Sequence, residues 1–174
     1  MDKSEQISLV EALLFVAGDS LSIADIKRLT GFSDAEAVEA VSALISRYRD
    51  TNGGVMVVEL ADGYQMVTNP TYAEWIKYLK KSKTSGKLSI AALETLALVA
   101  YKQPITKVEI EEIRSVSSDW TLKVLLERNL IKIAGRKDAP GKPLIFATTK
   151  EFLKYFGLKN LSDLPTLKEF TKEE

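Results

Sequence analysis

The side chains that most often carry catalysis near neutral pH are missing from this chain of 174 residues. It contains neither cysteine nor histidine, which excludes thiol nucleophiles, disulfides, Cys/His zinc sites and imidazole proton shuttles. Carboxylates, Lys, Tyr and Ser/Thr remain available for chemistry. The sequence therefore predicts no metal and no cofactor, and it favours a protein that is not an enzyme.

Acidic residues gather in two places where they could form an acid/base pair or bind a hard metal ion. The two groups are Asp34, Glu36 and Glu39, and Glu109, Glu111 and Glu112. Nothing in the sequence brings a second acidic group toward either one. Acidic side chains are also favourable near the N-terminus of a helix, on a face exposed to solvent. We interpret both groups as solvated helix faces.

A glycine-rich segment, residues 135–143, superficially resembles a phosphate-binding loop. Five residues separate its two glycines instead of four, and Pro143 stands where a Ser or Thr hydroxyl would bind magnesium. A strand is expected to follow, whereas phosphate binding of this type needs the N-terminus of a helix. We interpret the segment as the loop of a β-hairpin and refer to it as the second wing.

The overall composition is that of an ordinary globular protein, with 45% hydrophobic residues and 24 basic against 24 acidic side chains. Neither half of the chain is as basic as a dedicated binder of the phosphate backbone. No apolar run reaches the roughly 20 residues that cross a bilayer, and residues 1–6 do not resemble a secretory signal. We expect a soluble cytoplasmic protein that does not contact a membrane.

The chain contains an internal repeat. Residues 11–17, EALLFVA, match residues 94–100, ETLALVA, at an offset of 83. Later matches follow after a one-residue shift. Two copies of a unit of about 80 residues are the most economical explanation, and this length is sufficient for one hydrophobic core each.

The first copy reads as three helices. Ser4, Ser22 and Ser33 are the expected N-caps, Glu36 completes a capping box with Ser33, and Gly31 ends the second helix. The third helix is predicted to carry an apolar stripe made of Val38, Val41, Ile45 and Tyr48.

The second copy repeats this order. Ser89 precedes the first helix, Pro104 follows its end, Thr106 caps the second helix, and Ser117 or Ser118 begins the third. The predicted core residues of the third helix are Leu122, Leu125 and Leu126.

Each copy ends in a predicted β-hairpin. The strands are residues 55–60 and 64–68 around Asp62-Gly63, and residues 130–134 and 144–148 around the second wing. The fold class is therefore mainly α with small β-hairpins, in two tandem winged helix-turn-helix domains. We expect an N-terminal domain (1–79), a linker (80–88), a C-terminal domain (89–156) and a partly docked tail (157–174).

The third helices are poorly equipped to read DNA. The one in the first copy opens with acidic residues that would repel phosphates. In the second copy the outward face carries Trp120, Lys123, Val124 and Glu127, whereas base recognition uses Arg, Lys, Asn or Gln. An exposed Trp suits a protein partner better. The alternative is that Trp120 packs against Tyr101 or the linker.

The second wing carries Arg136, Lys137 and Lys142 against Asp138. This excess of positive charge could contact phosphates weakly or an acidic protein surface, and the alternative is a solvated turn. The candidate partner-binding residues are Trp120, Lys123, Val124, Arg136, Lys137 and Lys142. Weak DNA binding through this wing is the second interpretation of the function.

The first helix is apolar on two faces. One face carries Ile7, Val10, Leu14 and Ala17, and the other carries Leu9, Leu13 and Val16. A helix that is apolar all round is either buried centrally or shared with a second chain. Leu9, Leu13 and Val16 are therefore candidate dimerisation residues, with a central position in the core as the alternative.

Several longer segments resemble the segregation and condensation protein B family. The most extensive is residues 93–106, LETLALVAYKQPIT. Further segments that resemble this family are residues 109–114, 125–128, 135–141, 156–158 and 163–165. The resemblance is dense over residues 88–167 and looser before them. Family members usually have Gly where this chain has Ser115 and Trp120, and Arg-Pro in place of Lys142-Pro143.

The resemblance implies two tandem winged-helix domains in a non-enzymatic bacterial subunit. Such proteins form homodimers through the N-terminal domain and bind the kleisin subunit, segregation and condensation protein A. The kleisin bridges the heads of the structural-maintenance-of-chromosomes (SMC) ATPase, and the complex acts in chromosome condensation, chromosome partition and cell division. The resemblance thus implies a cytoplasmic protein that joins the nucleoid through this complex and touches DNA weakly or indirectly.

Overall fold

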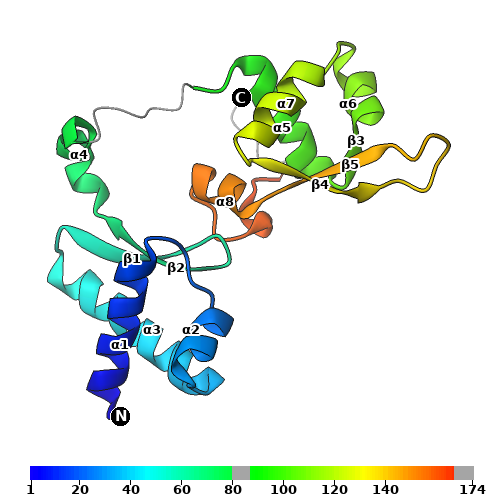
Figure 1. Ribbon diagram of the computed structural model, residues 1–174. Coiled ribbons are helices and arrows are strands. Elements are labelled where there is room, and N and C mark those ends of the chain that lie inside the picture. Colours follow the sequence, from blue (N-terminus) through cyan, green and yellow to red (C-terminus); the bar gives the residue numbers. More distant parts are fainter. Residues whose placement is uncertain (80–86, 167–174) are drawn as a thin grey trace. The chain divides into compact units, whose positions relative to one another are not determined.

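The structure, a computed structural model, describes residues 1–79 and 87–166 and divides them into two units (Figure 1). The first unit contains residues 1–79 and 157–166, and the second contains residues 87–156. Most of the predicted linker, residues 80–86, and the end of the predicted tail, residues 167–174, lie outside the described residues. Each unit combines three helices and a β-hairpin, followed by a short fourth helix, which confirms the predicted fold class.

The helices of the first unit begin at reciprocal capping boxes. These helices are α1 (Lys3–Ala17), α2 (Ile23–Thr30) and α3 (Asp34–Thr51). The predicted caps Ser22 and Ser33 are confirmed, but the prediction of Ser4 is wrong. Asp2 caps α1, because its carboxylate accepts a hydrogen bond from the Glu5 backbone N–H (2.9 Å) and the Glu5 carboxylate accepts one from the Asp2 N–H (2.8 Å).

The hairpin of the first unit consists of β1 (Val55–Leu60) and β2 (Gly63–Thr68), which pair antiparallel. The predicted reversal occurs one residue early, with Ala61 and Asp62 as the two turn residues in the left-handed region. Gly63 instead lies against the backbone of Leu21, where a Cβ would be 2.7 Å from the Leu21 carbonyl oxygen.

The core of the first unit lies between α1, α2, α3 and β1. Its buried residues are Val10, Leu14, Ile26, Ala37, Ala40, Val41, Leu44 and Val57. The prediction that Val38 belongs to the core stripe is wrong, because Val38 is 48% exposed. Ala37 and Ala40 face the core in its place. Their small side chains let α1 approach α3 closely, and α1 and α3 are in contact.

A short arm follows the hairpin of the first unit. It consists of the 3₁₀ helix η1 (Pro70–Tyr72) and the helix α4 (Ala73–Leu79), and neither contains a buried residue. This helix was not predicted from the sequence, because its seven residues are too few to show a helical period.

The second unit has the same order of elements plus one more short strand. Its elements are α5 (Ile90–Lys102), β3 (Ile105–Thr106), α6 (Lys107–Arg114), α7 (Asp119–Glu127), β4 (Ile131–Arg136), β5 (Leu144–Thr148) and α8 (Lys150–Phe156). The strand order is β3-β5-β4, all antiparallel. The predicted caps Ser89 and Thr106 are confirmed. Leu122 and Leu125 are buried, but the core prediction for Leu126 is wrong, because that side chain is only half-buried.

The segment after α8 returns to the first unit. The Ala61 and Asp62 N–H groups donate to the carbonyl oxygens of Leu158 (3.0 Å) and Lys159 (2.7 Å). The Lys159 ammonium lies 3.4 Å from the Glu59 carboxylate. The turn of the first hairpin is thus covered by the chain itself and is not presented to a duplex as a free wing. Within residues 1–79 and 87–166, every helix is too short or too polar to cross a bilayer.

Candidate partner-binding surfaces

The predicted outward face of α7 is exposed. Trp120 is 71% exposed, and the Lys123 ammonium lies 5.9 Å from the centroid of its ring. Val124 is half-buried beside them. A tryptophan exposed to this extent has most of its surface left for a partner. The role of these three residues in partner binding remains a prediction.

An apolar groove adjoins this face. We call it the α7 groove; its cavity volume is about 510 Å³. Its apolar lining consists of Val108, Leu122, Leu126, Pro143, Leu144 and Phe146. Its charged rim consists of Lys107, Asp119, Lys123 and Glu127. An apolar floor with a rim of both signs suits an amphipathic protein segment better than a polyanion.

Sequence reasoning missed this groove, apart from Lys123. Leu126 was assigned to the core because it continues the leucine run of α7, although it lies 100° further round the helix than Leu125. The alternation of side chains along β5 could have indicated the strand side of the groove, since Leu144 and Phe146 point to the same face of the sheet. Val108 lines the groove only because of the way α6 packs against α7, and no local sequence pattern predicts that packing.

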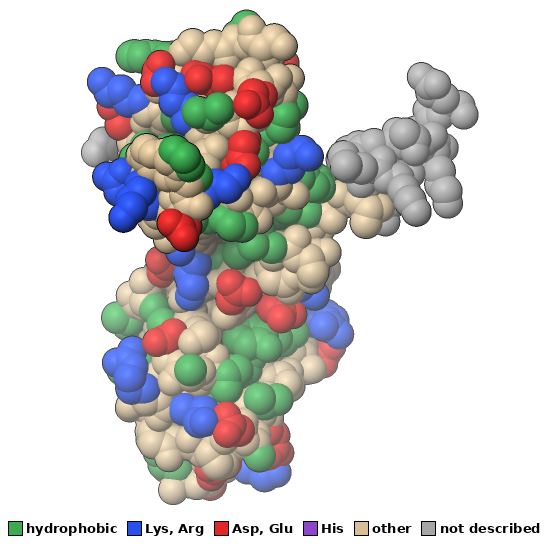
Figure 2. Space-filling model, turned by 90° about the vertical axis from the view of Figure 1, so that its right-hand side faces the viewer, with side chains coloured by type: hydrophobic (Ala, Val, Ile, Leu, Met, Phe, Trp, Pro, Cys, Tyr) green, Lys and Arg blue, Asp and Glu red, His purple; other side chains and the backbone are tan. Residues whose placement is uncertain are grey.

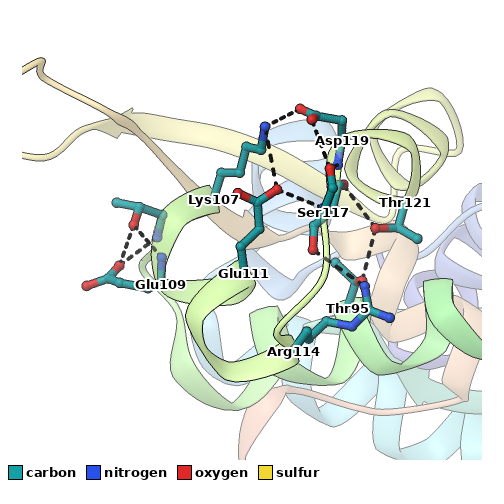
Figure 3. A network of polar contacts seen from close by, with 10 residues as sticks. Thr95, Lys107, Glu109, Glu111, Arg114, Ser117, Asp119 and Thr121 are labelled. Atoms are coloured by element: carbon teal, nitrogen blue, oxygen red, sulfur yellow. Dashed lines mark hydrogen bonds and ion pairs between the residues drawn. The ribbon is translucent and has the colours of Figure 1, made fainter.

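A polar network fixes α7 against α6 (Figure 3). The Lys107 ammonium contacts the Asp119 carboxylate and lies 3.5 Å from a Glu111 carboxylate oxygen. That pairing raises the pKa of Lys107 and lowers the pKa of Asp119. Glu111 also accepts a hydrogen bond from the Ser118 backbone N–H (2.8 Å), which ties α6 to the start of α7.

A second part of the network joins α5 to α6 and α7. The Thr95 hydroxyl donates to the Thr121 hydroxyl (3.1 Å), joining α5 to α7. The Arg114 guanidinium donates to the Glu94 carboxylate (2.9 Å), joining α6 to α5. These contacts hold the α7 groove in one shape before any partner arrives, which lowers the ordering cost of binding.

The second wing has less free positive charge than the sequence suggested. The Lys137 ammonium lies 2.6 Å from the Glu109 carboxylate of α6. Arg136 donates to the backbone carbonyl of Lys142 (3.0 Å), which holds its guanidinium along the hairpin. The charge of Lys137 is therefore compensated within the unit, and only Arg136 and Lys142 outweigh Asp138.

The pKa of Glu109 provides a test of this pairing. The Lys137 ammonium, together with the N–H and hydroxyl of Thr106, lowers the pKa of the Glu109 carboxyl to about 2 from an ordinary value of 4.5. Because the folded pKa is depressed, the stabilisation is complete above about pH 4.5 and is lost as the pH falls toward 2. In a carbon-detected NMR titration, we expect Lys137→Ala to raise this pKa, and Lys142→Ala to leave it unchanged. Equal midpoints in the wild type and Lys137→Ala would contradict the pairing.

Charge on the face shown in Figure 2 is mixed. On this face, Lys and Arg side chains alternate with Asp and Glu, and no continuous basic area is visible. On α3 the first turn is acidic, with Asp34 and Glu36 both exposed. Within the residues that the structure describes, no group of three or more acidic side chains could hold a metal ion. This surface is unsuited to a phosphate backbone.

The second apolar face of α1 points away from the core of the first unit. Leu9 and Leu13 are half-buried, and Val16 is 81% exposed. Phe15, which was not singled out from the sequence, is also exposed. These side chains do not occupy a central position in the unit, and their role in dimerisation remains a prediction.

The chain is similar to known proteins over nearly its whole length. A family model described as "Segregation and condensation complex subunit ScpB" matches residues 8–167. Segregation and condensation protein B of Syntrophotalea carbinolica is 43% identical over 172 residues, covering 99% of this chain and 87% of that protein. The protein of the same name from Desulforamulus reducens is 46% identical over 166 residues, covering 95% and 91%.

Two solved structures are also similar. ScpB from Mycobacterium tuberculosis is 30% identical, with a TM-score of 0.45, and the match covers 91% of this chain and 98% of that one. A dimer of the ScpB N-terminal domain complexed with an ScpA peptide is 32% identical, with a TM-score of 0.42. That match covers 44% of this chain and 95% of the other.

Proposed function

The chain belongs to the segregation and condensation protein B family, and from this premise we propose that it is a non-catalytic adaptor that binds the kleisin, segregation and condensation protein A. In this proposal it is a subunit of a condensin-like SMC–kleisin complex that condenses and partitions chromosomes. It contacts the SMC ATPase through the kleisin, acts in the cytoplasm and reaches the nucleoid with the complex. The family description names a complex subunit and no catalytic activity, in keeping with a chain that has neither His nor Cys.

The observation that carries the proposal beyond family membership is the α7 groove. Its floor is apolar, and its rim contains Lys107 of α6 together with Asp119, Lys123 and Glu127 of α7. An amphipathic segment of the kleisin would bury its apolar side chains on Leu126 and Val108, while Trp120 and Lys123 contact its flank.

Homodimerisation is the second part of the proposal. The exposed apolar side chains of α1 support an isologous contact between two first units, in which the same patch is used on both copies. Leu9, Leu13 and Val16 are the residues of α1 that we assign to it.

A direct test combines two measurements on the full chain. Purified kleisin should co-elute with the chain in size-exclusion chromatography, and light scattering of the chain alone should give twice the monomer mass. A chain that stays monomeric and does not bind the kleisin would overturn the proposal.

Weak DNA binding through the second wing is the alternative function. It is favoured only by exposed Arg136 and Lys142, since Lys137 is paired with Glu109. If phosphates were bound there, the triple change of Arg136, Lys137 and Lys142 to Ala would weaken duplex binding and reduce its salt dependence. We expect no such change in fluorescence anisotropy with a labelled duplex at low salt. A loss of binding in the triple variant would support the alternative.

A further inference from the structure

The arm of the first unit, residues 70–79, exposes large apolar side chains. Trp75 is 68% exposed, Tyr78 71% and Leu79 87%. Figure 1 shows α4 standing clear of α1, α2 and α3. Its main contact is with η1, the turn that precedes it.

A seven-residue helix of this kind is marginal on its own. Isolated helices shorter than about 12 residues are barely stable in water. Within the arm, the structure gives the Glu74–Lys77 ion pair (2.7 Å) and a ring contact between Tyr72 and Trp75 (6.4 Å between centroids). Both are exposed and contribute little. Docking of the apolar side chains on another surface would supply the missing stabilisation.

The same unit contains a hollow that is mainly apolar, like the exposed side chains of the arm. It lies between the C-terminal half of α3 and the edge of β1 that β2 does not cover, and its volume is about 480 Å³. Its apolar lining consists of Ile45, Tyr48, Val55, Met56, Val57 and Val58. Arg49 and Glu59 lie among the lining residues, and Asn69, which directly precedes the arm, lines the hollow as well. The arm therefore leaves the unit at the mouth of the hollow without filling it.

We propose that two copies of this chain exchange arms, so that α4 of each copy lies in the hollow of the other. This inference rests on the homodimer of the proposed function and adds to it a second contact, separate from the one assigned to α1. A reciprocal exchange is isologous and closes after two copies. Because the arm starts at the mouth of its own hollow, two hollows facing each other across a twofold axis bring each arm to the opposite one.

Area and charge both favour a second copy as the occupant. Trp75, Tyr78 and Leu79 leave roughly 400 Å² of apolar side chain uncovered per arm, given that one aromatic side chain spans about 150–250 Å². Two arms and two hollows would together bury about 1,600 Å², the size of a standard stable interface. The arm carries the oppositely charged pair Glu74 and Lys77. The hollow offers a charge of each sign to match them, in Arg49 and Glu59.

The first test removes the aromatic anchors in the full chain. The double variant Trp75→Ser/Tyr78→Ser should raise the dissociation constant of the dimer about 100-fold or more, measured by light scattering over a concentration series. Trp120→Ser is the matched control, because it removes an equally exposed tryptophan from the second unit; it should stay dimeric. A double variant that stays as dimeric as the wild type would overturn arm exchange, while the homodimer would stand. A monomeric wild type would overturn the homodimer itself.

The second test does not depend on weakening the dimer. Because the chain has no cysteine, two single variants, Tyr78→Cys and Val55→Cys, can be mixed and oxidised. Arm exchange predicts a covalent heterodimer of the two variants on a non-reducing gel. A Tyr78→Cys/Val55→Cys chain that crosslinks only within itself, or mixed single variants that do not crosslink, would overturn it. Kleisin co-elution is measured in parallel and reports the adaptor function separately.

Discussion

Replacing Leu126 by Glu should abolish kleisin binding without unfolding the second unit. The side chain is half-buried and lines the α7 groove, whereas its neighbour Leu125 is fully buried in the core. A carboxylate at this position would have to lose its water against Val108 and Phe146 when a partner docks. Central anchors of an interface cost about 2 kcal/mol or more when lost, so we expect the dissociation constant in calorimetry to rise by about 30-fold or more.

Ile133→Glu provides the matched control for this experiment. Ile133 is 50% exposed on β4 and is not among the residues that line the groove. Both variants should keep the thermal unfolding curve of the wild type, because neither side chain is in the core. If Ile133→Glu lost kleisin binding and Leu126→Glu kept it, the partner would bind at the exposed face of β4 instead of in the groove.

The elements that the sequence predicted well are those whose signals are local. A Ser or Thr followed three residues later by an acidic residue is the local pattern of a capping box, and Ser33 and Thr106 begin their helices as predicted. The prediction at Ser4 was wrong for the same local reason. Its residue at the third helical position is Ile7, which cannot accept a hydrogen bond, whereas Asp2 has Glu5.

What the sequence could not predict depends on packing between distant elements. The pairing of Lys137 with Glu109 joins residues 28 positions apart and decides how basic the second wing is. The return of Leu158 to the turn at Ala61 joins residues almost a hundred positions apart. Neither contact produces a periodic pattern in the sequence. Each nevertheless matters for DNA binding, because the first removes free positive charge from the second wing and the second covers the turn of the first hairpin.

The internal repeat illustrates a subtler limit. The offset of 83 sets Leu13 opposite Leu96, which is in the core of the second unit at 1% exposure. In the first unit the core position is taken by Leu14, and Leu13 lies half-buried on the outward face. The sequence alignment of the two copies is thus displaced by one residue from the alignment that superposes their buried positions. The displacement is not visible in the sequence, because adjacent positions of α1 carry similar apolar residues. As a result, one set of α1 side chains faces solvent.

This shift makes a quantitative prediction about two neighbouring leucines. Leu14→Ala should destabilise the first unit by about 3 kcal/mol, because removing a fully buried leucine costs 2–5 kcal/mol. Leu13→Ala should cost about 1 kcal/mol or less, since a half-buried side chain gives up less transfer free energy. Hydrogen exchange of the buried backbone of Val41 and Leu44 in the full chain reports on this unit alone. We expect it to accelerate about 100-fold in Leu14→Ala and by less than about 10-fold in Leu13→Ala. The reverse order would mean that the sequence alignment, and not the burial, identifies the core face of α1, and the outward stripe assigned to dimerisation would then belong to the core.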